Sequence, residues 1–357
     1  MRILDAKALA TLSAQIRIWA EELGFSALGI SDAGIDEAGA ALQEWISKGW
    51  HGEMGFMARH ADKRSSAPAL LPETKRVISV RMQYWPEAAA DAWSVLASPT
   101  HAYVARYALG RDYHRLMRRR LQRLADRITA KVGEFRYRAF VDSAPVMEKP
   151  LAQAGGIGWI GKHTNLIDPG SGSWFFLGEL YTDLPLPIDP PGRDHCGSCR
   201  RCIDACPTGA LDTPYQLDAR QCIAYLTIEH KTAIPESLRA AIGNRIFGCD
   251  DCQLVCPHNR DAPRGDSAFS PRFGLDRSEL ASLFEWDEES FMRYTAGSAI
   301  RRLGFERWMR NIAVALGNST PHEDTIRLLK SKLGCISALV DEHINWAIHR
   351  QQEMLAG

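Results

Sequence analysis

The chain has 357 residues, in which 43 basic side chains balance 43 acidic ones and give a formal net charge of zero at pH 7. This length is enough for two or three domains with a sizeable core, and the neutral balance excludes a protein that is basic over its whole surface. No stretch approaches the run of about 18 apolar residues that a membrane span needs, so we expect no membrane attachment.

The amino terminus and the cysteines bear on the cellular compartment. Residues 1–5 lack the basic and then apolar pattern of a secretory leader, so we expect a cytoplasmic protein whose nine cysteines are reduced. One of them, Cys335, follows Leu333 and precedes Ile336 and Leu339, which predicts a buried thiol in the core.

The first half of the chain has the pattern of amphipathic helices and short strands. Apolar residues recur every three or four positions from Leu9 to Leu23, which predicts a helix over 5–23 that ends at Gly24. A second helix is expected over 112–132, and strands are expected over 25–30, 77–80, 136–142 and 173–181.

Asp142 ends the alternating stretch 136–142 and has two interpretations. In α/β sheets ligands bind beyond the carboxyl ends of the strands, which makes Asp142 a candidate for chemistry. Asp142 also lies shortly before Pro145, which we expect to open a helix, so its carboxylate has an alternative role as a helix N-cap. Position alone leaves both interpretations open.

Residues 156–161 match the pattern GxGxxG, but a dinucleotide site is not expected there. That motif must follow a strand and open a helix, whereas a helical stretch precedes these glycines and residues 165–169 cannot continue as a helix. We expect the glycines to let the backbone approach a large flat ligand closely.

Two parts of the chain concentrate basic residues. Residues 101–140 hold eleven Arg or Lys against three Asp or Glu, a local asymmetry that suits a polyanion. Further along, Arg301, Arg302, Arg307 and Arg310 have the geometry to contact phosphates through their guanidinium groups. In both cases a solvated helix face is the alternative.

The strongest signal is a cysteine run, CxxCxxCxxxCP, that begins at Cys196. This spacing is typical of bacterial ferredoxins, in which three cysteines bind one cubane and the fourth binds the other. A second set, CxxCxxxCP from Cys249 with Cys222 upstream, completes the pattern.

We therefore expect two [4Fe–4S] clusters with crossed ligation. The first takes Cys196, Cys199, Cys202 and Cys256, and the second takes Cys206, Cys222, Cys249 and Cys252. A structural zinc site is the alternative, although it leaves the third cysteine of the run unused.

Prolines between 185 and 191, and again between 257 and 272, suggest three domains. We expect an α/β or α+β domain over 1–184, a ferredoxin-like domain over 185–262 and a helical domain over 263–357. Helical patterns over 301–317, 322–333 and 336–349 suggest a HEAT-type unit.

Two clusters conduct electrons but rarely perform two-electron chemistry themselves, so the long first domain should house a second cofactor or a substrate site. Flavin and corrinoid are both possible. The corrinoid motif DxHxxG has only a near match that includes Asp112 and His114, with Met117 in place of glycine, and we do not count it as a cobalt ligand. The histidines show no paired metal spacing and are interpreted as structural.

Five stretches together resemble the epoxyqueuosine reductase family: 142–149, 158–167, 196–207, 221–229 and 243–252. The resemblance covers most of residues 1–350. It implies a cobalamin-binding first domain similar to that of reductive dehalogenases, two [4Fe–4S] clusters, and C-terminal helices similar to HEAT repeats that hold the anticodon stem-loop. The implied reaction reduces epoxyqueuosine to queuosine at the tRNA wobble position, the last step of queuosine synthesis, through cob(I)alamin generated by the clusters. Ala224, His258 and the pair Ala67-Pro68 depart from the family pattern, and none of them is a predicted cluster ligand.

The same resemblance implies roles for individual residues. Asp142 would donate a proton to the opening epoxide, with a pKa raised by burial beside the corrin. The implied cobalamin contacts are Arg64, Asp142, Gly161, Lys162, His163, Leu166, Cys249 and Asp250. The implied tRNA contacts are Lys231, Arg245, Arg301, Arg302, Arg307, Arg310 and the basic stretch 101–140. The modified base would leave the loop stack, an unidentified low-potential donor would reduce the clusters, and the enzyme would act as a monomer.

Two other functions fit part of the sequence. One is a reductive dehalogenase-like enzyme for small molecules, which usually carries a twin-arginine leader that we do not expect here. The other is an iron–sulfur electron-transfer protein with an RNA-binding tail, against which the long first domain argues.

Overall fold

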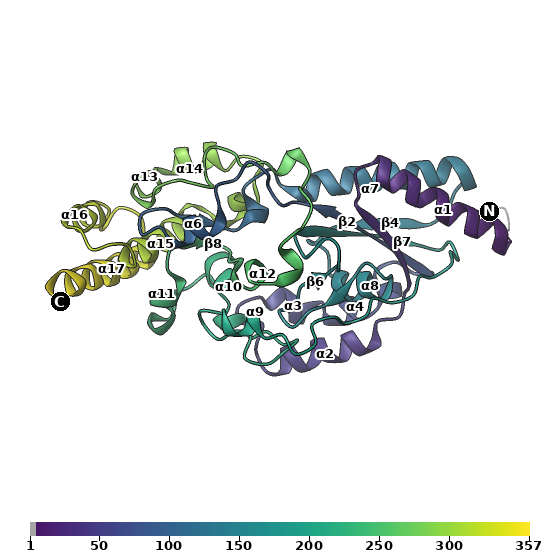
Figure 1. Ribbon diagram of the computed structural model, residues 1–357, viewed down its shortest axis with the longest axis horizontal. Helices are drawn as coiled ribbons and strands as arrows, with labels where there is room; N and C mark the ends of the chain where they lie inside the picture. Colours follow the sequence, from purple (N-terminus) through teal and green to yellow (C-terminus); the bar gives the residue numbers. More distant parts are fainter. Residues whose placement is uncertain (1–4) are drawn as a thin grey trace.

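The computed structural model describes residues 5–357, and its centre is a four-stranded sheet in the order β1-β2-β7-β4 (Figure 1). The strands are β1 (Ala27–Asp32), β2 (Arg76–Gln83), β7 (Phe175–Thr182) and β4 (Tyr137–Phe140). All three neighbouring pairs are antiparallel. The first part of the chain is therefore α+β. Asp142 does lie just beyond the carboxyl end of β4, but the rule that ligands bind there holds for the parallel strands of α/β sheets and does not apply to this sheet.

Helices cover both faces of this sheet (Figure 1). On one face, α1 (Ala6–Glu22) and α7 (Tyr113–Val132) bury Ile16, Leu121 and Leu124 against Ile78 and Leu180 of the sheet. The other face is covered by α8 (Glu148–Ala154) together with the short segments that follow β1. Those segments are α2 (Asp36–Ser47), α3 (Gly55–Arg59), α4 (Ala61–Arg64) and α5 (Ala67–Leu70).

Several local predictions are confirmed. The first helix runs over Ala6–Glu22 with Asp5 as its cap, and Gly24 follows it with a φ of 83° that glycine adopts without strain. The glycines from 156 onward do not open a helix, since they lie beside a hairpin of β5 (Trp159–Ile160) and β6 (Leu166–Ile167). A dinucleotide fold is therefore excluded, as expected.

Two local predictions are wrong. The helix expected to open at Pro145 begins only at Glu148, and no side chain caps it, so the N-cap interpretation of Asp142 fails. Cys335 is exposed, because it lies in the turn that joins α16 (Glu323–Ser331) to α17 (Ala338–Ala356) instead of on a buried helix face.

The cysteine-rich region is built from short helices. They are α9 (Arg201–Asp204), α10 (Ile223–Ile228), α11 (Glu236–Ile242) and α12 (Asp251–Leu254). The short strand β8 (Arg245–Phe247) pairs in parallel with β3 (Tyr103–Val104), so the chain around residue 103 is attached to this region. The packing therefore crosses the boundary expected near residue 185.

The C-terminal part is helical, as predicted. It contains α13 (Leu280–Phe284), α14 (Glu288–Tyr294), α15 (Phe305–Gly317), α16 and α17, and α15 packs against α17. The helix expected from residue 301 begins at Phe305, because Gly304, with a φ of 80°, separates it from a 3₁₀ turn over Ala299–Leu303. A core that includes Leu283, Phe284 and Trp308 also takes in Val104 and Leu109, which lie in the segment that connects α6 (Ala92–Ala97) to α7. Within residues 5–357, no helix has the length and apolar character to cross a membrane.

Candidate active site

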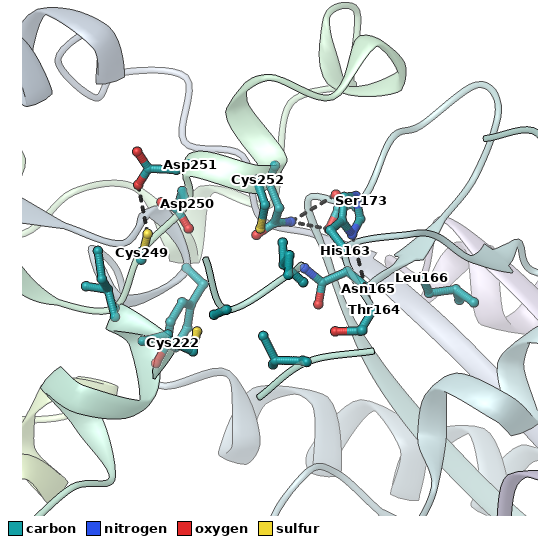
Figure 2. A pocket seen from close by; sticks show the side chains of 18 of the residues that line it. His163, Thr164, Asn165, Leu166, Ser173, Cys222, Cys249, Asp250, Asp251 and Cys252 are labelled. Carbon is teal, nitrogen blue, oxygen red and sulfur yellow. Dashed lines mark hydrogen bonds between the residues drawn. The ribbon is translucent and has the colours of Figure 1, made fainter. Parts of the chain in front are cut away.

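The eight cysteines of the two motifs fall into two groups in space. Cys206, Cys222, Cys249 and Cys252 line one cavity of about 360 Å³, part of which Figure 2 shows. Cys196, Cys199, Cys202 and Cys256 line a second, smaller cavity of about 70 Å³. The structure therefore brings together the two crossed sets that the spacing predicts, and all eight thiols are free of disulfides.

Burial raises the pKa values of five of these thiols, which are Cys202, Cys222, Cys249, Cys252 and Cys256, and so keeps them protonated when nothing binds them. It raises the pKa of Cys202 to about 11, with neighbouring Cys256 adding to the effect, and it raises the pKa values of Cys249 and Cys252 well above the ordinary value. Iron reverses this tendency, because a coordinating metal deprotonates its thiol ligands. Each set of four thiols thus lines one cavity and has the composition of a [4Fe–4S] donor set.

The loop of the smaller cysteine set is held by two side chains from the β5–β6 hairpin. Trp159 is buried and donates its indole N–H to Cys196 Sγ at 3.4 Å. Lys162 Nζ donates to the carbonyl oxygens of Gly197 and Cys199, and Gly161 lies close to Cys196. Lys162 and Gly161, two of the implied cobalamin contacts, therefore face the first cysteine set, and neither lines the larger cavity.

Replacing Trp159 by phenylalanine should lower the reduction potential of the cluster bound by Cys196. A hydrogen bond to a ligating sulfur stabilises the more negative, reduced cluster, so its loss makes reduction harder. Redox titration followed by electron paramagnetic resonance measures this shift in the protein with both clusters bound. Trp93→Phe is the matched control, because Trp93 is half exposed on the surface. Equal potentials in the wild type and both variants would contradict the role of this hydrogen bond.

The larger cavity has walls of two kinds. Figure 2 shows His163, Thr164, Asn165 and Leu166 on one side and Cys222 and Cys249 toward the other. Phe175 and Leu177 of β7 add apolar surface. Lys149 Nζ donates to Thr164 O and Asn165 Oδ1, both at 3.0 Å, and so fixes the segment that carries His163. His163 and Leu166, two of the implied cobalamin contacts, both line this cavity.

His163 has an unused hydrogen-bonding atom in this wall. Its Nε2 is buried and has no partner among residues 5–357. Burial lowers the pKa of His163 to about 4, so the imidazole is neutral. A buried nitrogen without a partner is costly, which indicates that a bound group supplies one.

Asp250 and Cys249 also line the larger cavity, as the resemblance implies. The Asp250 carboxylate is almost fully buried and accepts hydrogen bonds from Tyr103 Oη at 2.8 Å and from the Arg106 backbone N–H at 2.7 Å. Burial raises the pKa of Asp250 despite these two bonds.

Asp142 is at the protein surface, with a side chain that is 48% exposed, and it hydrogen-bonds a residue of this cavity. Its Oδ2 accepts from Tyr113 Oη at 2.8 Å and lies 3.0 Å from His114 Nε2, while His114 Nδ1 lies 2.7 Å from Asp112 Oδ1. Tyr113 lines the larger cavity, whereas His114 and Asp112 line a separate open cleft. Asp142 has a φ of 44°, a left-handed conformation that is uncommon outside glycine and costs some strain.

The charge state at Asp142 differs from the expectation of a raised pKa. Burial alone would raise the pKa of Asp142, but hydrogen bonds from His114 and Tyr113 outweigh burial and lower it. Burial likewise opposes the charge on His114, yet its bonds to Asp112 and Asp142 raise the pKa of His114 to about 9. At neutral pH the resting pair is therefore a carboxylate and an imidazolium.

Two further titratable groups lie near Asp142. Glu148 lines the larger cavity, and burial together with the charge of Asp142 raises its pKa to about 8. Burial lowers the pKa of Arg64, and the carboxylates of Asp142 and Glu148 oppose that change. Arg64 is thus close to Asp142, although it does not line the larger cavity.

The open cleft beside His114 has a volume of about 1070 Å³ and is rich in arginine. It is lined by Arg111, Arg115, Arg118, Arg119, Arg272, Arg301 and Arg302. The structure therefore joins the basic stretch 101–140 to two of the arginines predicted near residue 301.

Other arginines predicted to contact RNA are used inside the protein. Arg310 is fully buried and donates to the carbonyl oxygens of Leu226, His230 and Thr232. Arg245 is largely buried and pairs with Asp251, at 2.7 Å through Nε. Both predictions are wrong, because these guanidinium groups hold the fold.

The other two predicted contacts have different surroundings. Arg307 is half-buried and donates to the backbone oxygens of Ile228 and Leu303, so little of it is free for a phosphate. Lys231 is exposed but does not line the cleft.

The residues that sequence reasoning missed are Tyr113 and His114. Their signal was the near match to a corrinoid motif at Asp112 and His114, which identified a polar cluster but suggested the wrong chemistry. Only the fold brings His114 to Asp142.

Comparisons with known proteins point in one direction. The family model described as epoxyqueuosine reductase QueG, DUF1730, matches residues 64–143, and a 4Fe-4S double cluster binding domain matches residues 195–259. An epoxyqueuosine reductase of Xanthomonas campestris pv. campestris is 58% identical over 337 residues, which cover 94% of this chain and 95% of that protein. One from Pseudomonas aeruginosa is 56% identical and covers 96% of each chain.

Solved structures of epoxyqueuosine reductases have a similar fold. A crystal structure of epoxyqueuosine reductase with an epoxyqueuosine-modified tRNA-Tyr stem loop has a TM-score of 0.87 and 27% identity, and it covers 96% of this chain and 90% of that one. A Bacillus subtilis epoxyqueuosine reductase with its catalytic aspartate loop swung out of the active site has a TM-score of 0.85 and 27% identity over the same shares.

Proposed function

Because this chain belongs to the epoxyqueuosine reductase family, we propose that Asp142 is its proton donor and that the arginine cleft receives the anticodon stem-loop. The chain is an oxidoreductase that reduces epoxyqueuosine to queuosine in tRNA, with cobalamin and two [4Fe–4S] clusters as cofactors. The single observation that carries the proposal is the position of Asp142. It is bonded to a residue of the cofactor cavity, Tyr113, and to a residue of the cleft, His114.

The residues of the larger cavity fit a cobalamin beside the second cluster. Apolar side chains from Leu166, Phe175 and Leu177 suit the face of a corrin, and the unpaired Nε2 of His163 suits one of its polar substituents. Cys249 and Asp250 line the same cavity, so the second cluster would lie next to the cofactor. When bound, cobalamin supplies a reduced, strongly nucleophilic cobalt centre that is fed by the clusters.

The chain's own groups then have distinct tasks. Tyr113 orients Asp142 through its hydroxyl, because burial raises the pKa of Tyr113 well above its usual value and the hydroxyl keeps its proton. Asp142 delivers a proton to the oxygen of the opening epoxide, where negative charge develops. The cleft arginines neutralise phosphates of the RNA backbone, and the modified base leaves the loop stack to enter the cavity.

The larger organisation is part of the same proposal. Residues 1–184, 185–262 and 263–357 would act as the cobalamin, cluster and RNA-holding domains, with α15, α16 and α17 as a HEAT-like unit. An external low-potential donor would reduce the clusters, and the enzyme would work as a cytoplasmic monomer.

Binding of an epoxyqueuosine-containing stem-loop should weaken steeply as salt rises, since each neutralised phosphate releases counterions. Arg115→Gln and Arg119→Gln, both exposed at the cleft, should each reduce the slope of log affinity against log salt by about one unit. Fluorescence anisotropy with a labelled stem-loop measures this slope. Arg327→Gln on α16 is the matched control, because Arg327 is exposed and does not line the cleft. A flat salt response in the wild type would instead favour a small-molecule substrate.

A further inference from the structure

The proton requirement of the reaction is larger than one carboxyl group can meet. Removing the epoxide oxygen as water breaks two C–O bonds and forms one C=C bond, and it consumes two electrons and two protons. The electrons come from the external reductant through the clusters. Asp142 rests as a carboxylate, so the protons that it passes on must come from a neighbour.

Two side chains hydrogen-bond Asp142, and they are Tyr113 and His114. Burial raises the pKa of Tyr113 well above its usual value, so Tyr113 keeps its proton and His114 is the neighbour with a proton to give. The imidazole lies between two carboxylates, with Nδ1 at 2.7 Å from Asp112 Oδ1 and Nε2 at 3.0 Å from Asp142 Oδ2. Asp112 is the N-cap of α7 and accepts from the His114 backbone N–H at 3.0 Å, which fixes its position. His114 also stacks on Tyr113, with ring centroids 4.1 Å apart, so the ring is held with Nε2 directed at Asp142.

His114 can also regain protons from solvent. Its side chain is 22% exposed and lines the open arginine cleft, whereas Tyr113 faces the cofactor cavity. A proton lost through Nε2 can therefore be replaced by one from water in the cleft.

We propose that His114 supplies the protons that Asp142 delivers, passing each one from Nε2 to Asp142 Oδ2 and regaining it from water, while Asp112 stabilises the imidazolium. This inference rests on the proposed role of Asp142 and deepens it. His114 does not touch the substrate in this scheme, since it acts through Asp142.

The charges around His114 set the pH range in which it can work. The carboxylates of Asp112 and Asp142 favour its protonated form, whereas burial opposes it. Glu148 also interacts with the charge of His114, and Arg115, Arg118 and Arg302 line the same cleft as His114. The net result is a pKa raised to about 9. The proton supply is therefore complete at neutral pH and is lost as pH rises through about 9.

The test uses the enzyme with both cofactors bound and pre-reduced, in single turnover with an epoxyqueuosine stem-loop, so that electron delivery does not limit the rate. The wild-type rate should fall above about pH 9.

Asp112→Asn should move the pH at which the rate falls toward the ordinary histidine pKa of about 6.5. Asparagine caps a helix as well as aspartate does, so α7 should stay folded in this variant. His114→Gln should be roughly 100-fold slower and lack this fall. Imidazole added to His114→Gly should restore part of the rate.

His322→Gln is the matched control, because His322 also contacts an aspartate, Asp324, but is the N-cap of α16 and lines neither the larger cavity nor the cleft. Absorption spectra of the clusters and cobalamin check that each variant is loaded. If His114→Gln does not bind its cofactors, the shift in the alkaline fall of the Asp112→Asn rate still tests the relay. An unmoved alkaline fall in Asp112→Asn, or a near-normal rate in loaded His114→Gln, overturns the relay. Should Asp142→Asn be inactive at the same time, the role of Asp142 stands and only the relay is lost.

Discussion

Replacing Asp142 by asparagine is expected to slow queuosine formation by a factor of about 10² to 10⁴ while iron and cobalamin contents stay normal. Asparagine keeps the size of the side chain and an oxygen that can accept from Tyr113, but it has no acidic proton to give the epoxide oxygen. Nucleoside analysis of the digested stem-loop after single turnover measures the loss. The effect should appear in the rate and not in stem-loop affinity, because phosphate binding belongs to the cleft arginines.

The matched control for this variant is Asp126→Asn. Asp126 is an exposed aspartate of α7 that accepts a hydrogen bond from Gln122, and it is not part of the cavity or the cleft. Wild-type turnover in fully loaded Asp142→Asn would remove Asp142 from the chemistry and, with it, the relay through His114.

The parts of the site that could be predicted from the sequence are those that depend on local spacing. Three cysteines three residues apart reach one cluster from a single loop, so the spacing from Cys196 onward is enough to predict a cluster site. The helix over Ala6–Glu22 follows from apolar periodicity for the same reason. The partners of the cysteine sets also follow, since the spacing forces the fourth thiolate toward the other cluster.

What could not be predicted depends on tertiary placement. The pKa of Asp142 is lowered by His114, which is 28 residues earlier in the chain and reaches Asp142 only because α7 crosses the sheet beside β4 and β7. Arg310 belongs to a charge run that suits RNA, yet α15 is so enclosed that its guanidinium binds backbone oxygens. Lys162 is next to His163 in the sequence, but its ammonium group donates to the backbone of the loop that carries Cys196 and Cys199. In each case the residue type is compatible with two roles, and burial decides between them.

Double cysteine variants should reveal the crossed ligation directly. Cys202→Ala with Cys256→Ala removes two ligands of the first set, so one cluster is lost and the other remains intact, and about half of the iron should stay. Cys202→Ala with Cys206→Ala removes one ligand from each set, so no intact [4Fe–4S] cluster is expected. Both variants should be inactive, because electrons must pass through both clusters. Iron analysis and electron paramagnetic resonance of the reduced proteins measure the difference.

An uncrossed arrangement predicts the opposite pair of results, since Cys202 and Cys206 would then serve the same cluster and their joint loss would spare the other. Cys335→Ala is the matched control, because Cys335 is exposed and belongs to neither set. It should keep both clusters and full activity. Crossed ligation also accounts for the position of the second cluster next to the larger cavity. Cys206 belongs to the first cysteine motif but lines the larger cavity together with Cys249 and Cys252, and His163 and Leu166 line the same cavity. An intact cluster in the Cys202 and Cys206 double variant would overturn both the ligand sets and this path for electrons.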